Sequence, residues 1–170
     1  MIPTIGFVGR SNSGKTTLIE KLLAEFARRG LRVAVVKHTM HRHVETDLPG
    51  KDSRRYWEAG AAQTVLVAGD RVVMTRRAEN PSVDGALAAI SDVDLIIVEG
   101  HKQADYPKIE VIRAARDPHR IPGLKHVIAC VTDVPTLDCG GLPRFGFEAI
   151  LPLADFIAEQ LHLRRRWDAG

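Results

Sequence analysis

This chain of 170 residues has few cysteines, no long apolar run and no strong net charge of either sign. Its two cysteines, Cys130 and Cys139, cannot build a disulfide framework, and Cys130 lies in an apolar run, which favours a reducing cytoplasm. No apolar stretch approaches the roughly 18 residues that a transmembrane helix needs. No basic start followed by an apolar segment resembles a secretion signal. These absences predict a soluble cytoplasmic protein without a membrane partner.

The charge balance also argues against a nucleic-acid partner. The 24 Lys and Arg residues against 21 Asp and Glu residues leave a net charge of only +3, well short of a basic nucleic-acid arm. The excess cations lie in short clusters, such as residues 164–166, which suit solvated ends of helices or contacts to an acidic partner such as a nucleotide. Because no repeat or low-complexity linker divides the chain, we expect a single domain over residues 1–170.

Residues 9–16 read GRSNSGKT and match the P-loop pattern G-x-x-x-x-G-K-[ST] without a mismatch. Residues 5–8 before the loop have the composition of a short buried strand, and residues 17–23 after it have that of an amphipathic helix. This order of strand, loop and helix is the context that the motif requires. It disfavours the alternative of a glycine-rich turn that binds nothing, and predicts a polyphosphate site near the start of the chain.

The residue types in the loop suit a phosphate. Gly9 and Gly14 permit positive φ angles and close approach of the backbone, and the loop N–H groups with the helix N-terminus attract an anion. Lys15 is expected to contact the β- and γ-phosphates, Thr16 to ligate Mg²⁺, and Thr17 to contact the α-phosphate or simply to pack. The predicted nucleotide-binding segment is Gly9, Arg10, Ser11, Asn12, Ser13, Gly14, Lys15, Thr16 and Thr17.

Apolar strand-like runs alternate with helical patterns along the chain. We expect strands at residues 2–8, 32–36, 94–99, 109–112 and 126–131, and helices at 14–29, 52–59, 84–91 and 152–163. Residues 64–68 and 71–75 flank the two-residue turn Gly69-Asp70, which predicts a β-hairpin. The run 94–99 is the most hydrophobic and should be a central parallel strand. The pattern predicts an α/β fold: a three-layer P-loop NTPase with a mostly parallel central sheet and an inserted hairpin.

A P-loop needs a second acidic group to hold Mg²⁺, and the strand 94–99 offers two. Asp94 lies at its amino end and Glu99 at its carboxyl end, roughly 15 Å apart at about 3.3 Å per residue. Ligands of parallel sheets bind beyond the carboxyl ends of the strands. Glu99 is therefore the predicted metal partner, and Asp94 is interpreted as a strand-start residue.

The segment after the second strand emerges at the same edge of the sheet. Lys37 would face developing phosphate charge, and Asp47 would ligate Mg²⁺ or orient water, unless it is a turn or cap carboxylate. His38, His41 and His43 suggest a metal site, but no cysteine accompanies them, so exposed loop histidines are favoured. The candidate catalytic residues are Lys15, Lys37 and Asp47.

The signal for base recognition is weaker. The N/T-K-x-D sequence, whose Asp often reads guanine in P-loop proteins, is absent. Asp133 follows the strand 126–131 at the edge of the sheet where ligands bind. It could accept hydrogen bonds from the two guanine donors without the rest of the N/T-K-x-D sequence. The alternative is that Asp133 only forms a turn before Pro135. No arginine finger or water-positioning Gln is evident, although Arg10 and Arg113 are candidate cations, so hydrolysis should be slow.

Five segments together resemble the MobB family of molybdopterin-guanine dinucleotide biosynthesis adapter proteins. The Gly-Lys-Asp-Ser and Glu-Gly-x-Lys elements are specific to it, the resemblance extends over residues 2 to about 135, and His101 stands where the family usually has an aromatic. The segments are residues 36–38 (VKH), 47–53 (DLPGKDS), 59–61 (AGA), 98–102 (VEGHK) and 107–110 (PKIE). The resemblance implies a homodimeric GTP-binding protein with weak GTPase activity, GTP and Mg²⁺ as ligands, and a role in assisting a MobA-type guanylyltransferase to attach GMP to molybdopterin.

The sequence is compatible with alternatives for the hairpin and for the function. The hairpin at 64–76 is a candidate dimerisation element, because an isolated two-stranded ribbon needs a partner, but it could instead extend its own sheet. The resemblance does not say whether molybdopterin itself is bound. A small-molecule kinase, with residues 38–52 as a lid, is one alternative function. A metal-insertion GTPase that uses His38, His41 and His43 is another.

Overall fold

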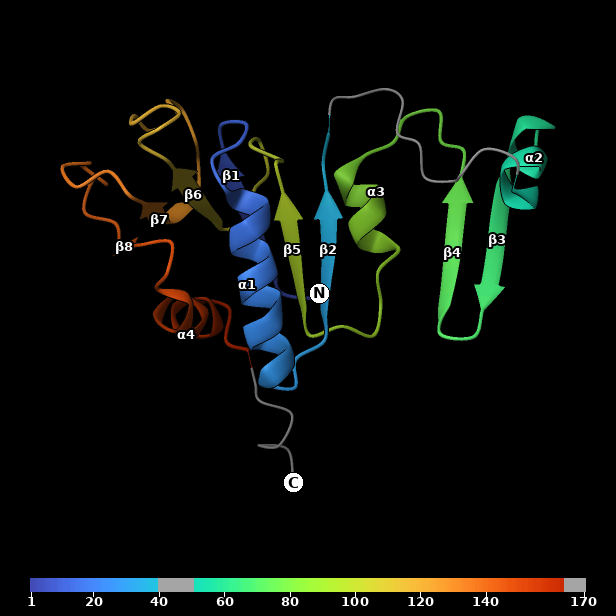
Figure 1. The fold of residues 1–170 in the computed structure, drawn as a ribbon, viewed down its shortest axis with the longest axis horizontal. Helices are drawn as coiled ribbons and strands as arrows, with labels where there is room; N and C mark the ends of the chain where they lie inside the picture. Colours follow the sequence, from blue (N-terminus) through green and yellow to red (C-terminus); the bar gives the residue numbers. More distant parts are fainter. Residues whose placement is uncertain (40–50, 164–170) are drawn as a thin grey trace. The chain divides into compact units, whose positions relative to one another are not determined.

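The computed structural model describes residues 1–39 and 51–163 (Figure 1). It divides into two compact units, one formed by residues 1–39 and 83–170 and the other by residues 40–82. The single domain expected over residues 1–170 stays a prediction. Asp47, His41 and His43 lie outside the described residues.

The larger unit is built on a six-stranded sheet in which every pairing is parallel. The strand order places β5 between β2 and β1, and β6 on the other side of β1, so the expected parallel sheet is confirmed. The strand 94–99 is interior as predicted, although the two middle positions belong to β1 and β6. In sheet order the strands are β2 (Val33–Lys37), β5 (Leu95–Glu99), β1 (Thr4–Gly9), β6 (Lys108–Ile112), β7 (Val127–Thr132) and β8 (Arg144–Phe145).

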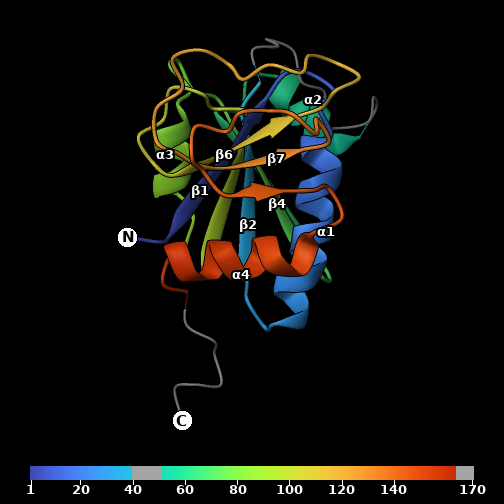
Figure 2. The ribbon, with the colours of Figure 1, turned by 90° about the vertical axis from the view of Figure 1, so that its left-hand side faces the viewer.

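Helices cover both faces of this sheet, and Figure 2 shows α1 (Lys15–Arg28) and α3 (Val83–Ala88) on opposite sides of it. Apolar side chains of α1 and of α4 (Ile150–Gln160) pack on one face in a single cluster with residues of β1, β5, β6 and β7. Val83 of α3 packs on the opposite face with Ile96 and Val98 of β5. The three-layer α/β architecture is therefore confirmed.

Burial on both faces explains why β5 reads as an unbroken apolar run. Successive side chains of a strand point to opposite faces, so Leu95 and Ile97 enter the cluster with α1, and Ile96 and Val98 enter the cluster with α3. All four side chains are at most 2% exposed. A sheet with one solvated face would instead show alternating polar residues.

Local signals set the ends of α1, whereas β8 depends on tertiary pairing. Gly30 adopts φ 76°, and the Leu31 N–H donates to the Phe26 carbonyl at 3.0 Å, which closes α1 with a left-handed glycine cap. The strand β8 was not predicted, because its two residues pair with β7 through contacts that no local pattern encodes. The helices α3 and α4 each end three residues earlier than expected.

The smaller unit contains α2 (Asp52–Glu58) and a hairpin formed by β3 (Gln63–Ala68) and β4 (Arg71–Arg76). The strands pair antiparallel, with Gln63 opposite Arg76 and Ala68 opposite Arg71, so the predicted Gly69-Asp70 turn is confirmed. The hairpin forms a two-stranded sheet of its own and does not extend the six-stranded sheet. Within the described residues, no helix is long and apolar enough to cross a membrane.

Candidate functional site

The P-loop connects β1 to α1 and depends on glycine at two positions. A side chain at Gly9 would collide with the carbonyl oxygen of Val111 on the neighbouring strand β6. Gly14 precedes the first residue of α1 with φ 88°, a left-handed conformation that L side chains rarely adopt. The two glycines thus place the loop against the sheet and set the start of the helix, so that its first N–H groups are available to an anion.

Lys15 folds back across this loop. Its ammonium group donates to the carbonyl oxygen of Arg10 at 2.7 Å and lies 3.4 Å from the hydroxyl of the buried Ser13. The pKa of Lys15 is lowered, chiefly because burial disfavours the charged form and also because Lys102 and Lys37 repel it, while Glu99 acts in the opposite direction. Three lysines and one carboxylate therefore share this region, an excess of positive charge that a polyanion would relieve.

Thr16 and Glu99 meet directly. The Thr16 hydroxyl lies 3.1 Å and 3.2 Å from the two carboxylate oxygens of Glu99, and the ammonium of Lys37 lies 3.8 Å from one of them. A hydroxyl beside a carboxylate is the hard oxygen donor set that Mg²⁺ prefers. The residues present therefore fit a magnesium ion between the first turn of α1 and the end of β5.

Sheet register explains why these residues from distant parts of the sequence converge. Glu99 pairs with Phe7 of β1 on one side and with Lys37 of β2 on the other, so these strands reach one edge together. Asp94 lies at the opposite edge, where it accepts the backbone N–H of Arg32 at 2.7 Å and thereby starts the strand. The separation of Glu99 from Asp94 that the sequence predicted is thus present in the structure.

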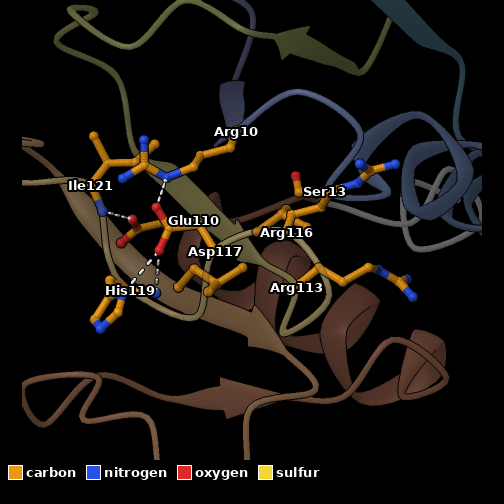
Figure 3. Close-up of a pocket in the computed structure, with 10 residues that line it drawn as sticks. Arg10, Ser13, Glu110, Arg113, Arg116, Asp117, His119 and Ile121 are labelled. Atoms are coloured by element: carbon orange, nitrogen blue, oxygen red, sulfur yellow. Dashed lines mark hydrogen bonds and ion pairs between the residues drawn. The ribbon is translucent and has the colours of Figure 1, made fainter.

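Arg10 belongs to the P-loop, but its side chain is engaged elsewhere (Figure 3). Its guanidinium forms an ion pair with Asp117. The Asp117 carboxylate also accepts a hydrogen bond from the ring Nδ1 of His119 at 2.9 Å. Hydrogen bonds from the backbone and the ring of His119, followed by the charge of Arg10, lower the pKa of Asp117. The cavity among these side chains measures about 10 Å³, room for about one water molecule. It does not accommodate a nucleotide.

Asp133 lies directly after β7, at the same edge of the sheet as the P-loop. One carboxylate oxygen accepts the backbone N–H of Ala114 at 2.7 Å, and the other lies 3.8 Å from the guanidinium of Arg113. The side chain is 41% exposed. Asp133 is therefore anchored through one oxygen, while a substantial part of its side chain stays exposed.

Two charged residues in the interior had no role assigned from the sequence. Lys108 and Glu110 of β6 are both 0% exposed. The ammonium of Lys108 donates to the carbonyls of Ala104 and Tyr106, and burial lowers its pKa. Glu110 accepts from Arg120 at 2.9 Å and from the backbone N–H of Ile121. Polar residues in an otherwise apolar strand were the available signal, and here they hold the loops that flank β6.

The histidines give little support to a metal centre. His38 and His101 have ring centroids 5.3 Å apart, and His101 Nδ1 lies 3.1 Å from the Tyr106 hydroxyl. Across residues 1–39 and 51–163, no group of three or more His, Cys, Asp or Glu side chains is arranged to hold a metal ion. His41 and His43, on which the metal-insertion alternative depends, lie outside the described residues.

The parallel sheet, the glycine-dependent loop and the Thr16–Glu99 contact define a protein of the P-loop class. The family model of MobB, molybdopterin guanine dinucleotide synthesis protein B, matches residues 4–133. The chain therefore belongs to the MobB family.

Similar proteins of known name cover nearly the whole chain. It is 39% identical over 167 residues to the molybdopterin-guanine dinucleotide biosynthesis adapter protein of Escherichia coli strain K12, over 94% of this chain and 93% of that protein. The corresponding adapter protein of Haemophilus influenzae is 38% identical over 172 residues, 95% of this chain and 90% of its own. The crystal structure of Bacillus subtilis MobB superposes with a TM-score of 0.76 at 30% identity, covering 94% of this chain and 98% of the other.

Proposed function

We propose that this protein is an adapter in molybdopterin-guanine dinucleotide biosynthesis that binds GTP with Mg²⁺ at the P-loop and hydrolyses it slowly. In this role it would assist a MobA-type guanylyltransferase to attach GMP to molybdopterin. The names of the relatives from Escherichia coli and Haemophilus influenzae support the pathway. No support for the alternative of a small-molecule kinase comes from these relatives.

The contact between Thr16 and Glu99 carries the proposal for the nucleotide. Residues 83 positions apart in the sequence place a hydroxyl and a carboxylate 3.1 Å apart at the N-terminus of α1. A P-loop that bound nothing would have no need of the surplus of lysines that faces Glu99 among the described residues. The surplus fits a polyphosphate, and the oxygen pair fits its metal.

Each side chain then has a defined task. Thr16 and Glu99 would hold the Mg²⁺, which when bound would neutralise charge on the phosphate oxygens. Lys15 would leave the carbonyl of Arg10 and turn to the β- and γ-phosphates, and Lys37 would stabilise charge that develops on the terminal phosphate. Asp47 stays a candidate for orienting water or for a second metal contact. Slow turnover is expected, because lysines stabilise charge but do not activate water.

The hairpin supports a homodimer. Six of its apolar side chains are between 40% and 74% exposed, and they come from both strands. A two-stranded sheet is marginally stable alone, so a second copy of the same hairpin would cover this surface in a self-complementary contact. A cytoplasmic location stays a prediction, and direct binding of molybdopterin stays an open alternative.

Substitution of Lys15 tests the nucleotide site. Lys15→Ala should abolish measurable GTP binding in isothermal titration calorimetry with Mg²⁺, because the loop loses the charge that contacts the phosphates. Lys125→Ala is the matched control, since Lys125 is exposed just before the amino end of β7, at the opposite edge of the sheet. If the Lys15 variant binds GTP as tightly as the parent, the site assignment is wrong.

Turnover separates the adapter from a kinase. An adapter should bind GTP and release GDP at a rate far below about 1 s⁻¹ without an acceptor, whereas kinases reach about 1 to 100 s⁻¹. Fast release of GDP that depends on an added hydroxyl acceptor would contradict the proposed function.

A further inference from the structure

The nucleoside end of the proposed nucleotide can be located from the order of the strands. Glu99, the proposed metal ligand, ends β5, and Lys37, proposed to face the terminal phosphate, ends β2. Both strands lie on the same side of β1. The strands β6, β7 and β8 lie on the other side. Because the P-loop itself holds the middle of the polyphosphate, the base and ribose would extend over the carboxyl ends of β6, β7 and β8.

Three side chains gather there, one from each of the loops that follow these strands. Arg113 comes directly after β6, Asp133 directly after β7, and Phe147 two residues after β8. The Arg113 guanidinium lies 3.9 Å above the centre of the Phe147 ring, and it lies 3.8 Å from Asp133. A β-carbon on Gly14 would lie 3.0 Å from Arg113 Nη2 and 3.4 Å from the Phe147 ring. The cluster therefore touches the P-loop at the start of α1.

The state of Arg113 differs from that of an arginine in a structural ion pair. Its Nε is buried and has no hydrogen-bond partner among the described residues, and the nearest carboxylate is at 3.8 Å, beyond hydrogen-bond distance. An unpaired buried N–H is unfavourable, so this guanidinium is held less firmly than one in a structural ion pair. The phenyl ring covers one face of the guanidinium, while 37% of the side chain remains exposed.

We infer that Arg113, seated on Phe147, is the surface on which the nucleobase stacks, with Asp133 as the hydrogen-bond acceptor at its edge. A planar guanidinium stacks well on aromatic systems, and a base would complete a three-layer stack of ring, guanidinium and base. Arg113 is then a determinant of nucleoside affinity and does not act on the terminal phosphate, because that phosphate belongs to the Glu99 side of β1. This inference rests on the proposed function of the P-loop.

A comparison of two ligands tests it. The affinities for GDP and for inorganic tripolyphosphate, each with Mg²⁺, are measured by calorimetry for the parent protein and for Arg113→Lys. Lysine keeps the positive charge but has no planar guanidinium on which a base could stack. GDP affinity should therefore fall by about 10-fold, the size expected for loss of one base stack. Tripolyphosphate affinity should not change. Arg116→Lys, an exposed position in the same loop, is the control and should leave both affinities unchanged.

The possible results separate this inference from the proposed function. Unchanged GDP affinity in Arg113→Lys, or equal loss of GDP and tripolyphosphate affinity, overturns the stacking role while the P-loop assignment stands. If circular dichroism shows that the lysine variant does not fold, Phe147→Leu provides the same comparison, because it removes the ring below the guanidinium. If the parent protein binds neither ligand, the proposed function fails and the inference fails with it.

Discussion

At the scale of single residues, the anchoring of Asp133 has a consequence for base selection. One of its oxygens accepts the backbone N–H of Ala114 at 2.7 Å, which fixes the plane and the direction of the carboxylate. Only the second oxygen is then available to a base. Guanine offers two N–H donors on the edge that a carboxylate reads, so the geometry favours guanine over bases that present acceptors there.

Substitution Asp133→Asn should therefore exchange the preferred base. The amide oxygen would keep the hydrogen bond from Ala114, and the amide nitrogen would occupy the outward position, where it donates instead of accepting. Affinity for GDP should fall by about 10-fold or more, because the guanine amino group then meets a donor. Xanthosine diphosphate, which has an acceptor at that position, should gain affinity.

Calorimetry with both nucleotides measures this exchange. Asp133→Ala serves as the comparison, since it removes the acceptor without adding a donor and should weaken GDP binding without improving the xanthine nucleotide. A parallel loss of both nucleotides in the asparagine variant would contradict a base-reading role for Asp133.

The positions of site residues at the carboxyl ends of strands could be predicted from the sequence. Contacts between residues of different loops could not. Glu99 follows from its position at the end of an apolar run, and the P-loop follows from its glycine spacing. The contact of Arg113 with Phe147 depends on the positions of β6 and β8 on either side of β7. The end of β6 at Ile112 and the start of β8 at Arg144 are separated by 31 residues, and no motif joins them. The single anchored oxygen of Asp133 likewise depends on a backbone group from another loop.

At the scale of elements, α1 carries a charge network that secures the end farthest from the P-loop. Glu25 accepts from Arg28 and Arg29, one turn further along the helix, at 2.6 to 2.8 Å. Arg29 also reaches Asp155 of α4 at 2.7 Å. Hydrogen bonds from Arg28 and then Arg29 lower the pKa of Glu25 from 4.5 to about 2. The network thus links the two helices that pack on the same face of the sheet.

This lowered pKa makes the stability of the fold depend on pH. A carboxyl group whose pKa is lower in the folded state stabilises that state above its ordinary pKa, and the contribution is lost as pH falls toward the folded value. Glu25→Gln should therefore be less stable than the parent near neutral pH. The difference should shrink as the pH falls from 4.5 to about 2.

Urea unfolding at several pH values in this range measures the free energy of unfolding of both proteins. The variant Glu159→Gln, which changes a glutamate of α4 in the same way, is the control for the general effect of losing one negative charge. A difference between parent and Glu25→Gln that stays constant across the range would mean that the carboxyl group is not held by the two arginines.

At the scale of the whole molecule, the hairpin exposes apolar side chains that a monomer would leave in contact with water. Its existence and register were predictable from the two-residue turn and the flanking β-branched residues. Its partner was not, because a strand pattern does not state which surface will cover it. Val67 is 74% exposed and Val72, opposite it, is 62% exposed. Exposed apolar residues of this number on a small sheet usually mark a protein contact.

A charge at Val67, the most exposed of the six apolar hairpin residues, should separate the proposed dimer. In a two-fold symmetric contact each substitution occurs twice, so Val67→Asp would bring two carboxylates into the same interface. Sedimentation velocity should give the parent protein twice the 18.7 kDa mass of one chain and the variant a single chain's mass. Val67→Thr keeps the β-branched shape without a charge and should remain dimeric. GTP binding by the aspartate variant should persist, since the P-loop, Glu99 and Arg113 all belong to the other compact unit. A monomeric parent protein, or a variant that stays dimeric, would exclude the hairpin as the dimer contact.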